Sequence, residues 1–213
     1  MLPNRQINHK RDFHYKQAKK EGYRARSAYK LIDIQKRYNI FKRAFYILDL
    51  GCAPGSWLQV AKTIAENNLI KYNDLHYHRD HYKILGVDTK NVFPIENIQT
   101  LKTDLTNPEI NAKIKSIFQN KLDLILSDAS INKSGNKFSD HLRQNKLCYS
   151  IMEIAKHHLK FKGILLMKAF QGIDFVDLVR NFKNEFKISK TYKPQSSKKK
   201  SNEIYIIGIQ KKN

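Results

Sequence analysis

The sequence predicts an α/β fold with a doubly wound, largely parallel sheet whose last strand is antiparallel. Apolar runs of strand length alternate with segments of helical periodicity along the chain, which is typical of such sheets. Glycine and proline separate the first apolar run from the first long helical segment, which indicates a strand, a tight loop and a helix. The last two strands are joined by a short connection, so they must pair in antiparallel fashion.

The first 43 residues are strongly basic, with thirteen lysines and arginines against three acids. Aromatic residues are interleaved with them, among them Phe13, Tyr15, Tyr23 and Tyr29. Basic groups bind phosphates and aromatic rings stack on bases, so this composition favours RNA. We therefore predict a basic RNA-binding arm over residues 1–43 and a single globular domain over residues 44–213.

A helix is expected at the end of this arm. Ser27 is a suitable N-cap for a helix that runs to about Tyr38, with Leu31 and Ile34 on its inner face. Lys30 then lies in the first turn, where the helix dipole disfavours a cation. An ordinary surface role remains the simplest interpretation of a single lysine among 40 basic residues.

The segment around the first strand is central to the prediction. Residues 46–50 predict a buried strand, Gly51–Ser56 a tight loop, and Ser56 to about Glu66 a helix. A loop of this kind lies at the carboxyl edge of a parallel sheet, where ligands bind. It fits neither the dinucleotide pattern G-x-G-x-x-G nor the Gly-Lys-Ser/Thr ending of a phosphate-binding loop, and Pro54 removes an N–H donor. A ligand without phosphates, such as S-adenosylmethionine, suits this loop better than a phosphate does, and a glycine-rich turn that binds no ligand is the alternative.

Acidic residues follow the next two strands. Ile84–Asp88 predicts a second strand, and an acid at this position accepts ribose hydroxyls in nucleotide-binding sheets. Residues 98–103 predict a third strand, and Asp104 at its end is a candidate partner for an adenine amino group.

The remaining elements continue the alternation. Helices are expected from Asn107 or Pro108 to Phe118, from Asp140 to Leu159 and from Ile173 to Phe186. Strands are expected over residues 122–129, 162–168, 187–192 and 203–209. Residues 130–138 favour a mobile loop. Because Asp128 and Lys168 end parallel strands and Glu203 begins the antiparallel one, all three are expected at one edge of the sheet.

Composition restricts the class of protein. The formal net charge of +21 indicates a polyanionic partner, nucleic acid before membrane. Cys52 and Cys148 are too few for a disulfide framework, which favours a reducing, cytoplasmic location. The histidines at positions 76, 78 and 81 lack an acid or cysteine that would complete a metal site, so a solvated loop is expected there. No apolar run has membrane length, no signal peptide is evident, and we expect a monomer.

Five blocks resemble, in order, those of the FtsJ/RrmJ-type RNA 2′-O-methyltransferase family. The blocks are Gly22–Leu31, Asp49–Trp57, Ser127–Asp128, Lys168–Gly172 and Ser201–Tyr205. The resemblance implies a class I S-adenosylmethionine-dependent methyltransferase with a Rossmann-like, seven-stranded sheet. It implies a catalytic tetrad of Lys30, Asp128, Lys168 and Glu203. It also implies cofactor contacts at Gly55, Trp57, Asp88, Asp104 and Asp128, to which the loop adds Gly51, Ala53, Pro54 and Ser56.

The implied target is the large ribosomal subunit, at a uridine of its 23S rRNA. A transfer-RNA anticodon-loop methyltransferase and a non-catalytic RNA-binding assembly factor are the alternatives. A nicotinamide oxidoreductase is the least favoured, because the loop lacks the pyrophosphate pattern. Methyl transfer to a ribose hydroxyl, which is a weak acid, needs a base, and Lys168 is the candidate. A free lysine has a pKa of about 10.4. Burial and the charge of Lys30 would lower the pKa of Lys168, whereas Asp128 and Glu203 would raise it, so the sign of the net shift stays open.

Overall fold

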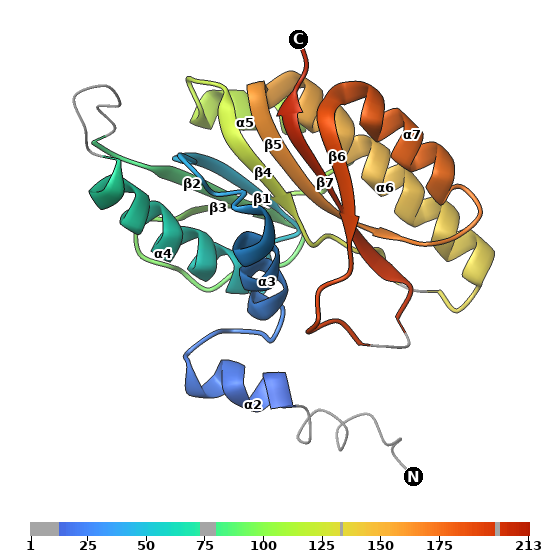
Figure 1. Ribbon diagram of the computed structural model, residues 1–213, viewed down its shortest axis with the longest axis horizontal. Helices are drawn as coiled ribbons and strands as arrows, with labels where there is room; N and C mark the ends of the chain where they lie inside the picture. Colours follow the sequence, from blue (N-terminus) through green and yellow to red (C-terminus); the bar gives the residue numbers. More distant parts are fainter. Residues whose placement is uncertain (1–12, 73–79, 133, 199–200) are drawn as a thin grey trace.

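The computed structural model describes residues 13–72, 80–132, 134–198 and 201–213 (Figure 1). The strands are β1 (Tyr46–Leu50), β2 (Lys83–Asp88), β3 (Gln99–Lys102), β4 (Leu122–Ser127), β5 (Leu159–Phe170), β6 (Phe186–Tyr192) and β7 (Glu203–Lys211). The helices are α2 (Phe13–Lys20), α3 (Ala28–Tyr38), α4 (Ser56–Lys71), α5 (Ile110–Ile117), α6 (Lys137–His158) and α7 (Phe175–Glu185).

The seven strands form one sheet in the order β3-β2-β1-β4-β5-β7-β6. Strands β1 to β5 pair in parallel, whereas β7 is antiparallel to both β5 and β6. Glu203, the first residue of β7, pairs with Phe170, the last residue of β5. The predicted fold class is therefore confirmed, and the start of β7 lies at the carboxyl edge of the parallel strands.

Alternate side chains of the strands enter two separate cores, one on each face of the sheet. Ile47 of β1 packs with Leu31 of α3 and Leu58 of α4, whereas the next residue, Leu48, packs in the cluster that contains Ile151 of α6. This alternation follows from the period of two in a strand, and a strand covered on both faces is apolar throughout. Figure 1 shows α3 and α4 on one face, and α6 and α7 on the other.

Helix α3 begins where the sequence predicts, but not for the predicted reason. Leu31 and Ile34 are buried as expected. Ser27 precedes the helix without a side-chain capping bond, and its hydroxyl lies 2.8 Å from the hydroxyl of Ser56. The helix ends at Asn39, which adopts a left-handed conformation with φ of 49°. Ser27 thus joins α3 to α4 instead of capping α3.

Several predicted boundaries were wrong by a few residues. Helix α4 extends beyond Glu66 to Lys71, and α5 begins only at Ile110, after a turn that contains Pro108. The side chain of Asn136 accepts a hydrogen bond from the Ser139 N–H at 3.1 Å, so α6 begins before Asp140. Asn136 is the N-cap of this helix, because its side-chain oxygen accepts a hydrogen bond from a free N–H of the first turn. The sequence reasoning assigned Asn136 to the polar loop.

The predicted histidine loop lies mostly outside the described residues, which include neither His76 nor His78. His81 is described, and its Nε2 lies 3.1 Å from the hydroxyl of Tyr46. Within the described residues, no group of three or more histidine, cysteine or acidic side chains is placed to bind a metal. In the same part of the chain, no helix combines the length and the apolarity needed to cross a membrane.

Candidate active site

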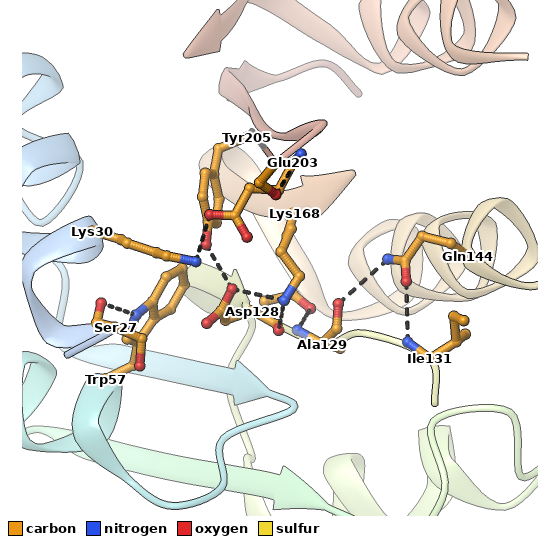
Figure 2. A network of polar contacts seen from close by, with 12 residues as sticks. Ser27, Lys30, Trp57, Asp128, Ala129, Ile131, Gln144, Lys168, Glu203 and Tyr205 are labelled. Carbon is orange, nitrogen blue, oxygen red and sulfur yellow. Dashed lines mark hydrogen bonds and ion pairs between the residues drawn. The ribbon is translucent and has the colours of Figure 1, made fainter. Parts of the chain in front are cut away.

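Four charged side chains from separate elements meet at the carboxyl edge of the sheet (Figure 2). Lys168 belongs to β5, Asp128 directly follows β4, Lys30 lies in α3, and Glu203 begins β7. The ammonium of Lys168 lies 3.0 Å from the Asp128 carboxylate, and that of Lys30 lies 2.7 Å from the Glu203 carboxylate. The structure thus brings together all four residues of the implied tetrad, arranged as two ion pairs.

The two ion pairs are joined through Tyr205. Its hydroxyl donates a 2.6 Å hydrogen bond to the Asp128 carboxylate, and the Lys30 ammonium lies 5.7 Å from the centre of its ring. Lys168 also donates to the backbone carbonyl of Asp128 at 2.5 Å. Sequence reasoning did not single out Tyr205. The available signal was its position two residues after Glu203, which puts both side chains on one face of β7.

Both acids of the tetrad favour their charged forms. Burial opposes ionisation of Asp128, but the charges of Lys168 and Lys30 outweigh it and lower its pKa. Glu203 shows the same balance. Burial alone would raise its pKa, but the charge and the hydrogen bond of Lys30 outweigh burial and lower the pKa below its ordinary value. Burial and the Asp128 charge raise the pKa of Tyr205 well above its ordinary value, so this phenol stays a hydrogen-bond donor.

A pocket of about 610 Å³ opens beside Asp128. Of the predicted cofactor residues it contains Gly51, Ala53, Asp88, Asp104 and Asp128. It is further lined by Thr89, Lys90, Leu105, Thr106, Ala129, Ser130, Ile131, Asn132, Arg143, Lys146 and Leu147. Its volume falls within the range of about 300–1,000 Å³ that is usual for small-molecule sites.

The acids of β2 and β3 shape the loops of this pocket. Asp88 accepts hydrogen bonds from the backbone N–H groups of Ala53 and Lys90, both at 2.9 Å. Asp104 accepts two from Thr106, at 2.8 Å from its N–H and 2.7 Å from its hydroxyl, and these bonds lower the pKa of Asp104. Both of those bonds go to Oδ1, and a carboxylate has further acceptor sites for a ligand.

The glycine loop approaches the strand beside it closely. Gly51 has φ of +77°, and a Cβ built on it would lie 2.5 Å from the Cα of Ala129. No other residue fits this position without displacing the backbone after β4. The pocket floor therefore depends on a residue that lacks a side chain.

Four predicted cofactor residues do not line the pocket, namely Pro54, Gly55, Ser56 and Trp57. Ser56 and Trp57 are each 2% exposed, and both contact Ser27. The Trp57 indole N–H donates to the Ser27 carbonyl at 2.8 Å. These side chains fix the arm on α4 because α3 covers the start of that helix, a contact that local sequence does not reveal.

The loop between β4 and α6 is anchored by side chains of α6. Gln144, which is fully buried, accepts from the Ile131 N–H at 3.1 Å and donates to the Ala129 carbonyl at 3.4 Å. Asp140 accepts from the Ser134 N–H at 2.8 Å and the Ser134 hydroxyl at 2.7 Å. Sequence reasoning predicted a mobile loop here and missed these two anchors, whose partners are backbone groups in another element.

Replacing Asp140 is expected to remove a pH-dependent part of the stability. Hydrogen bonds from the Ser134 N–H and hydroxyl lower the pKa of Asp140 to about 2. An unfolded aspartate has a pKa of about 3.9, so the contribution is complete above pH ~4 and disappears as the pH falls towards 2. Urea unfolding at several pH values should show the stability difference between the unmodified chain and Asp140→Asn shrinking over that window.

The matched control is Asp177→Asn. Asp140 pairs with Arg143, three residues later in α6, and Asp177 pairs in the same way with Arg180 but is exposed on α7. It should leave the pH profile close to that of the unmodified chain. A constant difference for Asp140→Asn between pH 5 and pH 2 would contradict the assignment.

A second, smaller cavity of about 200 Å³ lies on the arm side of the tetrad. It is lined by Ala25, Arg26, Ser27, Lys30, Lys198, Ser201 and Glu203. The tetrad therefore contributes to both cavities, with Asp128 in the larger and the pair of Lys30 and Glu203 in the smaller. Arg26 and Lys198 make the smaller one basic.

Comparison with known proteins gives concordant matches. Residues 23–211 match the model of the FtsJ-like methyltransferase family. A Methanosarcina mazei protein named ribosomal RNA large subunit methyltransferase E is 42% identical over 201 residues, which cover 93% of this chain and 69% of the relative. A protein of the same name from Methanothermobacter thermautotrophicus is 39% identical, with coverage of 95% and 91%.

Solved structures agree with these matches. A Plasmodium falciparum protein described as a ribosomal RNA methyltransferase superposes with a TM-score of 0.74 and 32% identity, covering 89% of this chain and 98% of that one. Fibrillarin in a complex with Nop5p superposes with a TM-score of 0.54 and 18% identity, covering 78% and 73%, and this likeness concerns the fold alone.

Proposed function

The chain belongs to the FtsJ-like methyltransferase family, and from this membership we propose that it is an S-adenosylmethionine-dependent RNA ribose 2′-O-methyltransferase. Its substrate in this proposal is ribosomal RNA, at a uridine of the large-subunit 23S rRNA. The names of the relatives, which are large-subunit methyltransferases, support this choice over transfer RNA.

One observation carries the proposal, namely that the tetrad is shared by two cavities of different chemistry. The larger cavity is lined by three aspartates at strand ends together with Lys90, Arg143 and Lys146, and the smaller is lined by Arg26, Lys30 and Lys198 with the acid Glu203. A methyl donor that carries a sulfonium, an ammonium and a carboxylate suits the mixed charges of the first, and an RNA backbone suits the basic groups of the second. A hydroxyl at the boundary between them would lie beside the Lys168 and Asp128 pair.

The residues of the larger pocket fit S-adenosylmethionine. Asp88 is the last residue of β2 and Asp104 lies two residues after β3, where they suit ribose hydroxyls and an adenine amino group. The donor also carries an amino-acid end with both charges, and the pocket offers Lys90 and Arg143 as well as acids. When bound, S-adenosylmethionine supplies an electrophilic methyl group on a sulfonium. Ala53 and Gly51 let the backbone come close to such a ligand.

In the proposed mechanism Lys168 is the base. Its amine, once neutral, would take the proton of the ribose 2′-hydroxyl as that oxygen bonds to the methyl carbon and the methyl–sulfur bond breaks, with the electron pair of that bond left on sulfur. Its carboxylate and carbonyl partners on Asp128, at 3.0 and 2.5 Å, fix the direction of the amine. Glu203 holds the Lys30 ammonium in place through their ion pair. In this mechanism the Lys30 cation lies close to the reacting oxygen and stabilises the negative charge that develops on that oxygen.

The basic arm is the proposed RNA-binding element, with its boundary at residue 43. Within α2, Lys16, Lys19 and Lys20 are exposed, and Phe13 is 72% exposed. Exposed cations and an exposed ring are suited to phosphates and to unstacked bases. Helix α3, the last helix of this arm, carries Lys30, so the proposal connects RNA binding directly to the tetrad.

The test is transfer of labelled methyl groups from S-adenosylmethionine to undermodified large ribosomal subunits, with bulk transfer RNA in parallel. We expect label in the large-subunit RNA, at a nuclease-resistant linkage that marks ribose methylation. Label in transfer RNA instead would contradict the substrate assignment. Binding of S-adenosylhomocysteine without transfer to either RNA would favour a non-catalytic assembly role.

A further inference from the structure

Two arginines of the arm, separated by one residue, bind different loops. The Arg24 guanidinium donates to three backbone carbonyls, those of Pro54 at 3.1 Å, Phe93 at 2.7 Å and Pro94 at 2.8 Å. Arg26 instead donates to the carbonyl of Ser196 at 2.7 Å, in the connection between β6 and β7. Arg24 therefore contacts the loops around the larger pocket, whereas this bond of Arg26 lies in the connection between β6 and β7.

Both loops bound by Arg24 also form walls of that pocket. Pro54 follows Ala53, and the loop that carries Phe93 and Pro94 begins at Thr89 and Lys90. On the pocket side, the Ala53 N–H already donates to Asp88. A guanidinium has five donors in a rigid plane. A single Arg24 side chain, which does not line the pocket, can therefore fix the two loops relative to each other.

The neighbouring sequence accommodates this guanidinium. A Cβ built on Gly55 would lie 2.8 Å from the Arg24 Nη1 and 3.2 Å from a methyl carbon of Val92. Gly55 has φ of +106°, a conformation that suits glycine. The missing side chain at position 55 thus leaves room for Arg24 between the loops.

The backbone of Arg24 is fixed as well. The Gln59 side chain of α4 accepts from the Arg24 N–H at 2.9 Å and donates to the Gly22 carbonyl at 2.9 Å. An arginine whose main chain is already fixed loses less conformational freedom when its side chain binds the loops. Arg24 is therefore held at its main chain by Gln59 and at its guanidinium by the loop carbonyls.

We propose that Arg24, a residue of the basic arm, is a positioning residue that sets the shape of the methyl-donor pocket. It touches neither the tetrad nor, through its side chain, the pocket interior, and it acts through the Ala53 and Thr89–Lys90 walls. This inference rests on the proposed function and deepens it, because it assigns part of the cofactor affinity to the arm.

The experiment is calorimetric titration of the full chain with S-adenosylhomocysteine. Arg24→Met removes all three bonds and should raise Kd about tenfold, which corresponds to roughly 1.4 kcal/mol. Arg24→Lys keeps the charge without the planar fork and should give an intermediate Kd. Arg180→Met, which replaces an exposed arginine of α7 that lines neither cavity, is the control and should leave Kd unchanged. In Gly55→Ala the added methyl group crowds the guanidinium while Arg24 itself is not substituted, and this variant should also bind S-adenosylhomocysteine more weakly.

Kinetics and stability complete the test. Arg24→Met should raise KM for S-adenosylmethionine while kcat at saturating cofactor stays close to its original value, a split that general loss of structure does not produce. An unchanged Kd in Arg24→Met, or an equal rise in Arg180→Met, would overturn the inference. An unmodified chain that binds no S-adenosylhomocysteine would contradict the proposed function itself, and with it this inference.

Discussion

Lys168→Met is expected to lower the rate of methyl transfer by about 10²–10⁴-fold, the usual contribution of general acid–base catalysis. Lys168 is 7% exposed, and its ammonium donates two hydrogen bonds to Asp128. These bonds hold the amine at the carboxyl edge of the sheet, where the variant would have no basic nitrogen. Methionine has a similar length and fills the same space without a basic nitrogen. Single-turnover transfer to large ribosomal subunits, together with S-adenosylhomocysteine affinity, measures the effect.

Lys160→Met is the matched control for this variant. Lys160 lies on the same strand and also pairs with an aspartate of β4, Asp123, but at the opposite edge of the sheet. It should leave the transfer rate near that of the unmodified chain. Lys168→Met removes the partner of a partly buried carboxylate, so both variants need thermal unfolding as a check on folding. A Lys168→Met protein that folds, binds cofactor and still transfers methyl groups at the original rate would rule out Lys168 as the base.

RNA affinity is expected to fall steeply as salt increases, by about 10³-fold or more between 50 and 200 mM if six or more phosphates are bound. The basis is a formal net charge of +21 and thirteen basic residues among the first 43. Phosphate binding by lysine and arginine releases counterions, and this release becomes less favourable at high salt. Filter binding or fluorescence anisotropy with a fragment of large-subunit RNA gives the slope of log K against log salt.

Paired charge variants locate the effect. Replacing Lys19 and Lys20 of α2 by glutamine should reduce the slope by about 2, roughly one for each phosphate contact. Replacing Lys183 and Lys187 removes the same charge where β6 begins, at the edge of the sheet opposite the tetrad, and should change the slope little. If both pairs change the slope equally, the arm has no special role and the charge acts as a diffuse field.

Local pattern was sufficient for the order and type of the elements and for the convergence of Asp128, Lys168 and Glu203, whereas Lys30 was implied only by the family resemblance. Apolar runs such as residues 46–50 and 122–127 record burial on both faces, and the residue that ends each strand is visible in the sequence. Parallel strands share one carboxyl edge, so Asp128 and Lys168 had to lie near each other. The antiparallel β7 then brought Glu203 to the same edge.

The contacts of the arm depended on tertiary structure. Ser27 was predicted as a helix cap, yet it makes no capping bond, and its carbonyl accepts a hydrogen bond from the Trp57 indole N–H. Arg24 appeared as one basic residue among many, and three loop carbonyls determine its role. Periodicity reports which side of an element is buried, but not which backbone groups of a distant loop lie opposite it. Those partners are set only when α3 packs on α4 and both pack on the sheet.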